Sequence, residues 1–276
     1  MGGQVTEHNS TIDSRDHSLL RNGRLSIRKV LLRAAISLIR NAVPILLAML
    51  APVMILTLIG EFFLTNGVPW SASVVALSVV TYVAFILLWV GFASVLHARF
   101  LDRRERPPLW RVLIWSRTQL DFLIGILKVL GLIVLMNVVV VVAAVVAGPL
   151  AQLIGVLAAS FVWARLSMVF PGASVGRPLA LEDSWSLTSN ARGRVVILLG
   201  SLYLVAQIFV PMVLGLVLFF GSNWYIEAAV AALMFGGAAV VAAVLSATYQ
   251  ALVEMRPQHV RDTYIPEDGS RLADTS

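Results

Sequence analysis

Residues 119–170 read QLDFLIGILKVLGLIVLMNVVVVVAAVVAGPLAQLIGVLAASFVWARLSMVF, and this stretch decides the fold. It contains two apolar runs, 119–147 and 149–170, with Gly148 alone between them. Each run is long enough for a membrane-spanning α-helix, which needs about 20 apolar residues. Glycine followed by Pro149 is typical of a tight turn. The stretch therefore predicts two antiparallel membrane helices that form a hairpin.

Similar apolar runs lie on both sides of this hairpin, at residues 42–63, 71–97, 195–220 and 225–252. Of the 276 residues, 59% are hydrophobic and 13% are charged, whereas about 25% are charged in a soluble domain. We therefore predict an all-α integral membrane bundle of six helices. The polar stretches between the runs are too short to bury a core of their own, which excludes a separate catalytic domain.

Basic residues indicate which connections face the cytoplasm. Lys and Arg cluster before the first span, between the second and third, between the fourth and fifth, and after the sixth. The connections near Asn66, Gly148 and Ser222 carry none. Because positive loops stay cytoplasmic, we expect both termini in the cytoplasm. Lys29 and Lys128 are the only lysines among 21 basic residues, an arginine bias typical of a GC-rich bacterial genome, so we expect the bacterial inner (plasma) membrane.

Three domains follow from these patterns. Residues 1–23 and 256–276 are polar, so we predict disordered cytoplasmic segments on both sides of a six-helix transmembrane domain at 24–255. Residues 24–40 place basic side chains among Leu, Ile and Val at helical spacing, which predicts an amphipathic helix on the cytoplasmic membrane face. Shorter versions of it occupy 110–117 and 181–190.

Each predicted amphipathic helix precedes a pair of spans, so the chain favours three repeated helical hairpins. Three hairpins of similar length would also arise by chance in any protein with six spans.

Cations inside the apolar runs are the main candidates for a binding site. Lys128 lies 20 residues before Gly148 and Arg165 lies 17 residues after it, so antiparallel helices place both cations at about the same depth. An unpaired cation at such a depth costs about 2.5 kcal/mol or more. We therefore predict that Lys128, Arg165 and Arg177 bind an acidic lipid headgroup or another anion.

Ion pairing within the protein is the alternative for these cations. Asp121 lies seven residues before Lys128, on the same helical face. Glu182 and Asp183 follow in the next polar stretch, which could fold back toward Arg165. In this interpretation, all three carboxylates are structural partners of the cations.

Enzyme signatures are weak in this sequence. The chain has no cysteine, and its four histidines are scattered, so we expect no metal and no cofactor. Residues 172–176 match the G-x-S-x-G pattern, but they follow a membrane helix and lack the strand, histidine base and oxyanion hole that a serine nucleophile requires. Paired carboxylates, the H-E-x-x-H pattern and a phosphate-binding loop are also absent from the sequence.

The end of the fourth run and the stretch after it carry a family resemblance. Arg165 precedes Pro171 at the end of the run, and a Ser-Trp-x-x-Thr segment follows at Ser184, Trp185 and Thr188. With these motif residues, positions 25–255 resemble a six-helix bacterial membrane family. That family includes the membrane domain fused to some glycerophosphodiester phosphodiesterases, together with free-standing members of unknown function.

The resemblance implies a fold and no reaction, because no phosphodiesterase domain follows Ala251. We predict a multi-pass membrane protein without enzymatic activity that has a lipid-responsive or envelope-maintenance role. Its predicted partners are membrane lipids with anionic headgroups, and no nucleic acid. The alternative is a transporter or permease subunit whose loops at 98–118 and 171–194 dock a cytoplasmic protein.

Overall fold

The computed structural model describes residues 20–21, 24–65, 73–101, 107–189, 191, 193–220 and 223–256. Six stretches of this part of the chain are helical, long and apolar enough to cross a membrane, so the predicted all-α fold with six spans is confirmed. The chain is a multi-pass membrane protein. These stretches are Ala42–Ile59, Val79–Leu101, Arg117–Val142, Leu150–Ser174, Arg194–Gly215 and Trp224–Glu254.

The elements follow the predicted order. The long helices are α2 (Ala42–Thr65), α3 (Ser73–Leu101), α4 (Arg117–Ala147), α5 (Pro149–Leu166), α8 (Arg194–Phe220) and α9 (Trp224–Glu254). The short elements are β1 (Leu20–Arg21), β2 (Arg24–Leu25), α1 (Ile27–Arg40), the 3-10 helix η1 (Leu109–Val112), α6 (Val169–Ser174) and α7 (Leu181–Ser189).

The N-terminal boundary differs from the prediction. Leu20 and Arg21 fall in the segment predicted to be disordered, but they form β1, which pairs antiparallel with β2. The prediction for residues 1–19, 22–23 and 257–276 lies outside the described residues.

The fourth predicted span, 149–170, is two helices in the structure. Helix α5 ends at Leu166 and α6 begins at Val169. Pro171 explains the break, because proline has no N–H to donate to the Ser167 carbonyl and its ring crowds that position. The Phe170 N–H bonds the Ser167 carbonyl instead, at 3.3 Å, a tighter turn that redirects the chain.

The amphipathic helix predicted at 110–117 is also wrong. Only the single 3-10 turn η1 forms there, directly after Pro107 and Pro108. Helix α4 then begins at Arg117, and the Gln119 side chain accepts the Ser116 N–H at 2.7 Å. This is half of a capping box, which explains why α4 starts at this residue.

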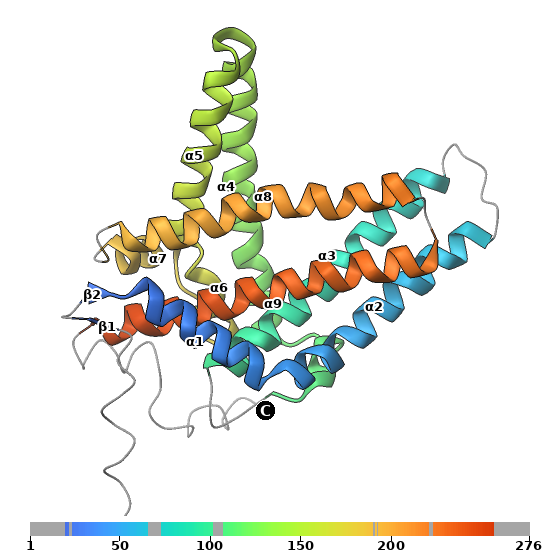
Figure 1. The fold of residues 1–276 in the computed structure, drawn as a ribbon, viewed down its shortest axis with the longest axis horizontal. Coiled ribbons are helices and arrows are strands. Elements are labelled where there is room, and N and C mark those ends of the chain that lie inside the picture. The colour runs from blue at the N-terminus through green and yellow to red at the C-terminus, as the bar shows by residue number, and fades with distance from the viewer. Residues whose placement is uncertain are drawn as a thin grey trace, which may run out of the picture.

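Helix α9 is the centre of the body of the molecule. It packs against α1, α2, α3, α6, α7 and α8, and Figure 1 shows it between α8 and α2. Every residue from Ala242 to Val253 is buried. Many of these residues are Ala or Ser, and such small side chains let neighbouring helices approach closely.

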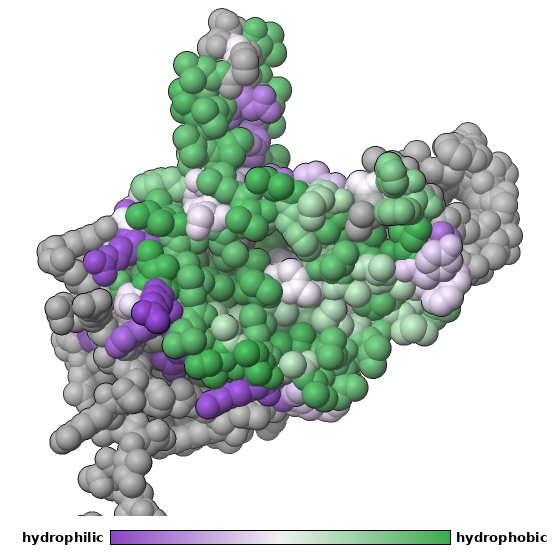
Figure 2. Space-filling view, viewed as in Figure 1, coloured by the Kyte–Doolittle hydropathy of each residue, from purple (hydrophilic) through white to green (hydrophobic). Residues whose placement is uncertain are grey.

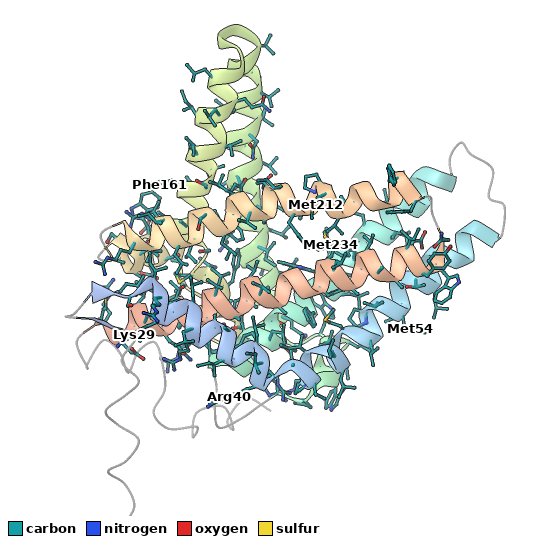
Figure 3. All side chains as sticks on the ribbon, in the orientation of Figure 1. Lys29, Arg40, Met54, Phe161, Met212 and Met234 are labelled. Atoms are coloured by element: carbon teal, nitrogen blue, oxygen red, sulfur yellow. The ribbon has the colours of Figure 1, made fainter. Side chains whose placement is uncertain are left out.

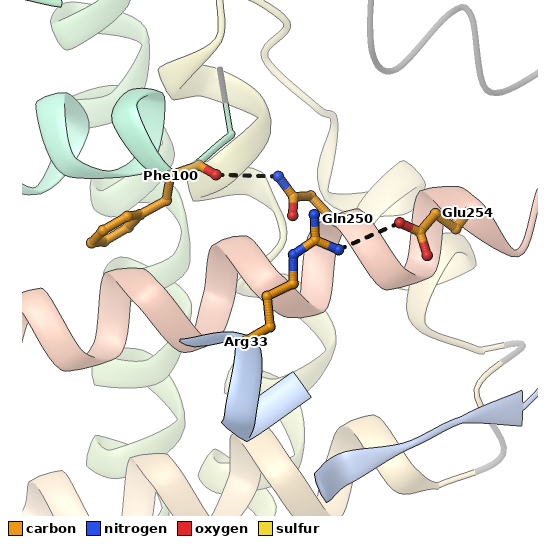
Figure 4. Close-up of polar contacts among 4 residues, drawn as sticks. All are labelled: Arg33, Phe100, Gln250 and Glu254. Carbon is orange, nitrogen blue, oxygen red and sulfur yellow. Dashed lines mark hydrogen bonds and ion pairs between the residues drawn. The ribbon is translucent and has the colours of Figure 1, made fainter. Parts of the chain in front are cut away.

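Helix α1 lies across the C-terminal half of α9 (Figure 1). Arg33 on α1 forms an ion pair with Glu254, with 3.6 Å between Nη1 and Oε1. Close by, the Gln250 side chain donates to the Phe100 carbonyl at the end of α3, at 3.2 Å (Figure 4). These contacts join α1, α3 and α9 at one end of the body.

The α4–α5 hairpin projects away from the body (Figure 1). Its base packs against α3, α6, α7 and α8. Gly148 joins the two helices with a φ of 74°, a backbone conformation that glycine adopts without steric cost. Further down, Gly155 lies so close to the Val140 side chain that a Cβ at this position would overlap with it. The two helices are therefore in direct contact.

The surface of the molecule separates apolar from polar regions. Figure 2 shows mostly hydrophobic residues over α8, α9 and the hairpin, with hydrophilic residues at the end where α1 and α7 lie. Large apolar side chains on α4, α5 and α8 are exposed, among them Val142, Leu153 and Ile208. In a membrane protein such a surface faces the lipid chains.

Candidate functional site

The candidate site lies at the end of α5, where the Arg165 side chain lies against two aromatic rings whose centres are 5.7 Å apart, edge to face. Its guanidinium carbon is 5.2 Å from the centre of the Phe161 ring and 5.6 Å from the centre of the Trp185 ring. Both distances are within the range of a cation–π interaction. Figure 3 labels Phe161 at the base of the hairpin, next to α7. We call Arg165, Phe161 and Trp185 the aromatic clamp.

The backbone of Arg165 holds α7 in place. The Ser184 hydroxyl donates to the Arg165 carbonyl at 2.8 Å. Thr188 Oγ1 lies 3.4 Å from the same oxygen and 2.9 Å from the Trp185 carbonyl, so Ser184 is the stronger donor. The last carbonyls of a helix have no partner within it. The side chains of α7 therefore cap α5 and place the Trp185 ring over the guanidinium.

The guanidinium of Arg165 has donors that no described residue accepts. Its Nε and Nη1 atoms are buried and have no hydrogen-bond partner. A buried charged donor without a partner is costly, because the lost hydration is not replaced. The two rings offset part of this cost, but they accept no conventional hydrogen bond in the guanidinium plane. An acceptor such as an anion would satisfy these donors.

The carboxylates predicted as alternative partners lie in the first turn of α7. Glu182 and Asp183 are both exposed, and the Asp183 carboxylate accepts the Ala180 N–H at 3.3 Å. Asp183 therefore helps to start α7, where a negative charge is favourable. No ion pair between either carboxylate and Arg165 occurs in the part of the chain that the structure describes.

Lys128 is close to Arg165 in depth but differs in environment. Val140 contacts Gly155, and counting twelve residues from this contact along each helix sets Lys128 level with Ser167. The Lys128 side chain is exposed, and Asp121 is half-buried two turns earlier on the same face of α4. Within the described ranges, no ion pair joins the two. The structure therefore brings Arg165 together with Trp185, and leaves Lys128 on the hairpin surface.

The remaining predicted residues lie around the clamp. Arg177 is half-buried in the loop after α6 and already takes part in an interaction. Pro171 is buried within α6. The four motif residues therefore have two roles. Arg165 is contacted by Ser184, Trp185 and Thr188, whereas Pro171 ends α5.

Phe161 is the residue of the clamp that the sequence pattern did not predict. It lies four residues before Arg165, and residues with this spacing share one face of a helix. An aromatic residue one turn before a cation was therefore the available signal. The signal is weak, because aromatic residues occur throughout the spans.

Helix α1 presents a second arrangement of charge and apolar surface, with three faces. Val30 and Ala34 are buried against the body. Next to this face runs an exposed apolar stripe, and beyond it a basic edge; Arg28 lies at the start of the helix. The stripe consists of Leu31, Leu32, Ile36 and Ile39, and the edge of Lys29, Arg33 and Arg40. Figure 3 shows Lys29 and Arg40 near opposite ends of α1.

Two further buried polar groups in the core form hydrogen bonds within the protein. His97 Nδ1 on α3 is 2.8 Å from Ser246 Oγ on α9, and both residues are buried. Ser174, in the G-x-S-x-G segment, is buried and donates to the Pro171 carbonyl of its own helix at 2.7 Å. Across the described residues, no group of three His, Cys, Asp or Glu side chains could hold a metal ion.

Comparison of the chain with protein families, curated proteins and solved structures finds no match. The resemblance to the six-helix family stays a prediction. The contact between Arg165 and the Ser-Trp-x-x-Thr segment, in contrast, is an observed feature of the fold.

Proposed function

We propose that this protein is a non-enzymatic component of a bacterial inner membrane that binds anionic lipids on its cytoplasmic face, in a lipid-responsive or envelope-maintenance role. The observation that carries the proposal is the three-faced geometry of α1. One face is held by the body, so the exposed apolar stripe and the basic edge keep a defined orientation relative to the spans.

This geometry suits the surface of an anionic bilayer. Leu32 and Ile39 on the stripe can insert among the acyl chains, while Lys29 and Arg40 remain at the level of the headgroups. Each cation near an anionic surface contributes about 1 kcal/mol to binding. The exposed Trp110 and Trp115, around η1, are of the residue type enriched at membrane interfaces.

Charge placement supports the orientation that we propose. The end of the body with α1 and α7 is hydrophilic, and positive segments stay in the cytoplasm. Trp224 and Tyr225, at the start of α9, fit the opposite interface. Both termini are then cytoplasmic, and Lys128 and Arg177 add positive charge on the same side.

Lipid retention by the full chain tests this proposal. Purified protein is exchanged into nanodiscs that contain equal amounts of phosphatidylglycerol and phosphatidylcholine, and the lipids that remain bound on release into detergent are counted by native mass spectrometry. We expect enrichment of phosphatidylglycerol, and a reduced enrichment in the double variant Arg28→Gln, Arg40→Gln.

The double variant Arg28→Lys, Arg40→Lys is the matched control, because it keeps both charges and should retain the enrichment. Equal retention of the two lipids by the unaltered protein would overturn the proposal. Equal enrichment in the Gln variant and the unaltered protein would show that α1 does not bind the anionic lipid.

A further inference from the structure

We infer that the aromatic clamp is a site for one phosphate group, with Arg165 as the ligand-binding residue and the Trp185 ring as its cover. The inference rests on the proposed function, because the phosphate of an anionic phospholipid is its expected source. Free inorganic phosphate shares the same chemistry and is the other source. The tests below distinguish the two.

The donors of Arg165 define the ligand. A guanidinium carries five N–H donors in one plane and binds two oxygens of a single phosphate along one edge. The guanidinium carbon lies 5.2 Å from the Phe161 ring centre and 5.6 Å from the Trp185 ring centre, and the two rings contact each other. The buried Nε and Nη1 atoms lack a partner. They belong to different edges of the guanidinium, so a phosphate on either edge, Nε with Nη2 or Nη1 with Nη2, would satisfy one of these two open donors.

The depth of Arg165 also fits a lipid phosphate. The C-terminal end of α5, which carries Arg165, contacts α7. The end of the body with α1 and α7 is the hydrophilic one that we place at the cytoplasmic interface (Figure 2). A long side chain at this end reaches the phosphate layer.

Trp185 is the more exposed ring of the clamp, at 42% against 37% for Phe161, and the Nε and Nη1 atoms of Arg165 are buried. In the proposed site, the indole ring moves aside to admit the phosphate. Ser184 and Thr188 are positioning residues, because their hydroxyls tie α7, and with it Trp185, to the Arg165 carbonyl.

Short-chain phosphatidylglycerol provides the direct test. The full-length protein, delipidated in detergent, is titrated with it, and bound lipid is counted by native mass spectrometry. We expect one tightly held lipid, bound about tenfold more weakly by Arg165→Gln, since loss of a charged hydrogen bond costs more than 1.4 kcal/mol. Arg165→Lys keeps the charge but lacks the planar fork, so we expect intermediate affinity.

Lys128→Gln is the matched control, because it removes an exposed cation at the same depth. We expect its affinity to remain within about twofold, well below the tenfold scale of a lost charge contact. A loss as large as that of Arg165→Gln would show that general charge, and not the clamp, holds the lipid, and would overturn the inference. Unchanged affinity in Arg165→Gln would do the same.

Thermal stability separates a binding role from a structural role. Without phospholipid, Arg165→Leu should melt at the same temperature as the unaltered protein or higher, because an unpaired buried cation has been removed. Added phosphatidylglycerol should raise the melting temperature of the unaltered protein and leave that of Arg165→Leu unchanged. An equal rise in both proteins would contradict the site.

Two further measurements identify the source of the phosphate. If inorganic phosphate stabilises the unaltered protein as strongly as phosphatidylglycerol does, the ligand is a soluble phosphate. The phosphate site would then stand, and the phospholipid as its source would be overturned. The α1 variant Arg28→Gln, Arg40→Gln should lose the general anionic enrichment yet keep the single tight lipid. The α1 variant therefore tests the proposed function, and the Arg165 variants test the phosphate site separately.

Discussion

Residues 242–253 of α9 and the outer half of the α4–α5 hairpin are both long, apolar and helical, yet their environments are opposite. Every one of the twelve α9 residues is buried. On the hairpin, Val142 is 64% exposed and Val145 is 84% exposed. Hydropathy therefore indicates which segments enter the membrane, but it does not indicate which of them other helices surround.

Side-chain size accounts for the difference. The α9 segment includes Ala242, Ala243, Ser246 and Ala247, and small residues allow several helix backbones to approach one helix. The outer hairpin carries a run of valines at 138–142. Their bulky β-branched side chains keep other backbones at a distance, so this part of α4 packs on α5 through contacts such as Val140 with Gly155.

The largest expected effect comes from enlarging a residue at the centre of α9. Ala242 is 1% exposed, so Ala242→Leu has no space for its added atoms and should destabilise the fold by about 3 kcal/mol. Val142→Leu on the hairpin should change stability by less than about 0.5 kcal/mol. Thermal unfolding in detergent measures both. Similar melting temperatures for the two variants would contradict the comparison.

A second pair of substitutions compares close packing in the body, at Gly91 on α3, with close packing in the hairpin. A Cβ at Gly91 would overlap with the Val112 backbone carbonyl, whereas a Cβ at Gly155 would overlap with the Val140 side chain. Gly91→Ala should therefore cost about 2 kcal/mol, because backbone must move. Gly155→Ala should cost a similar amount, because a new Cβ would also overlap with the Val140 Cβ, which rotation of that side chain does not move. A larger loss for Gly155→Ala would show that the hairpin is the more rigid region.

The two ends of α5 allow a third comparison. Ser184→Ala removes the main donor to the Arg165 carbonyl and should cost about 1 kcal/mol. Gln152→Leu, near the hairpin turn, changes an exposed residue and should have no measurable effect on unfolding. Proteolysis at α7 gives an independent measurement, since Ser184→Ala should speed cleavage there.

The smallest expected effect concerns the middle of the hairpin. Asn137 donates to the Ile133 carbonyl of its own helix at 2.9 Å and also interacts with the Tyr203 side chain on α8. Polar contacts between membrane helices average about 0.6 kcal/mol, so Asn137→Val should lower stability by about that amount. A loss of several kcal/mol would mean that this contact, and not the base, attaches the hairpin to the body.

The sequence predicted the six spans because apolar length alone determines them. It also predicted the hairpin turn at Gly148 and the amphipathic character of α1. It did not predict that α1 packs against α9, because hydrophobic periodicity does not identify the partner of a face. The projection of the α4–α5 hairpin was missed for the same reason.

The candidate site was predictable in part. Arg165 was expected because a cation in an apolar run requires a partner. The Ser-Trp-x-x-Thr segment was expected through a family resemblance, without a physical role. Its role depends on the direction that the chain takes between α5 and α7 after Pro171, and local patterns do not determine that direction.

The one-residue connection at Gly148 has a consequence for how the chain is made. No hydrophilic segment separates α4 from α5. No polar loop therefore crosses the bilayer before α5 is made, and no polar residues at the outer end of α4 hold this helix across the bilayer by itself. We expect the ribosome to deliver both helices before either enters the lipid, so that the hairpin inserts in one step. Synthesis of α5 then sets the moment at which α4 becomes a membrane helix.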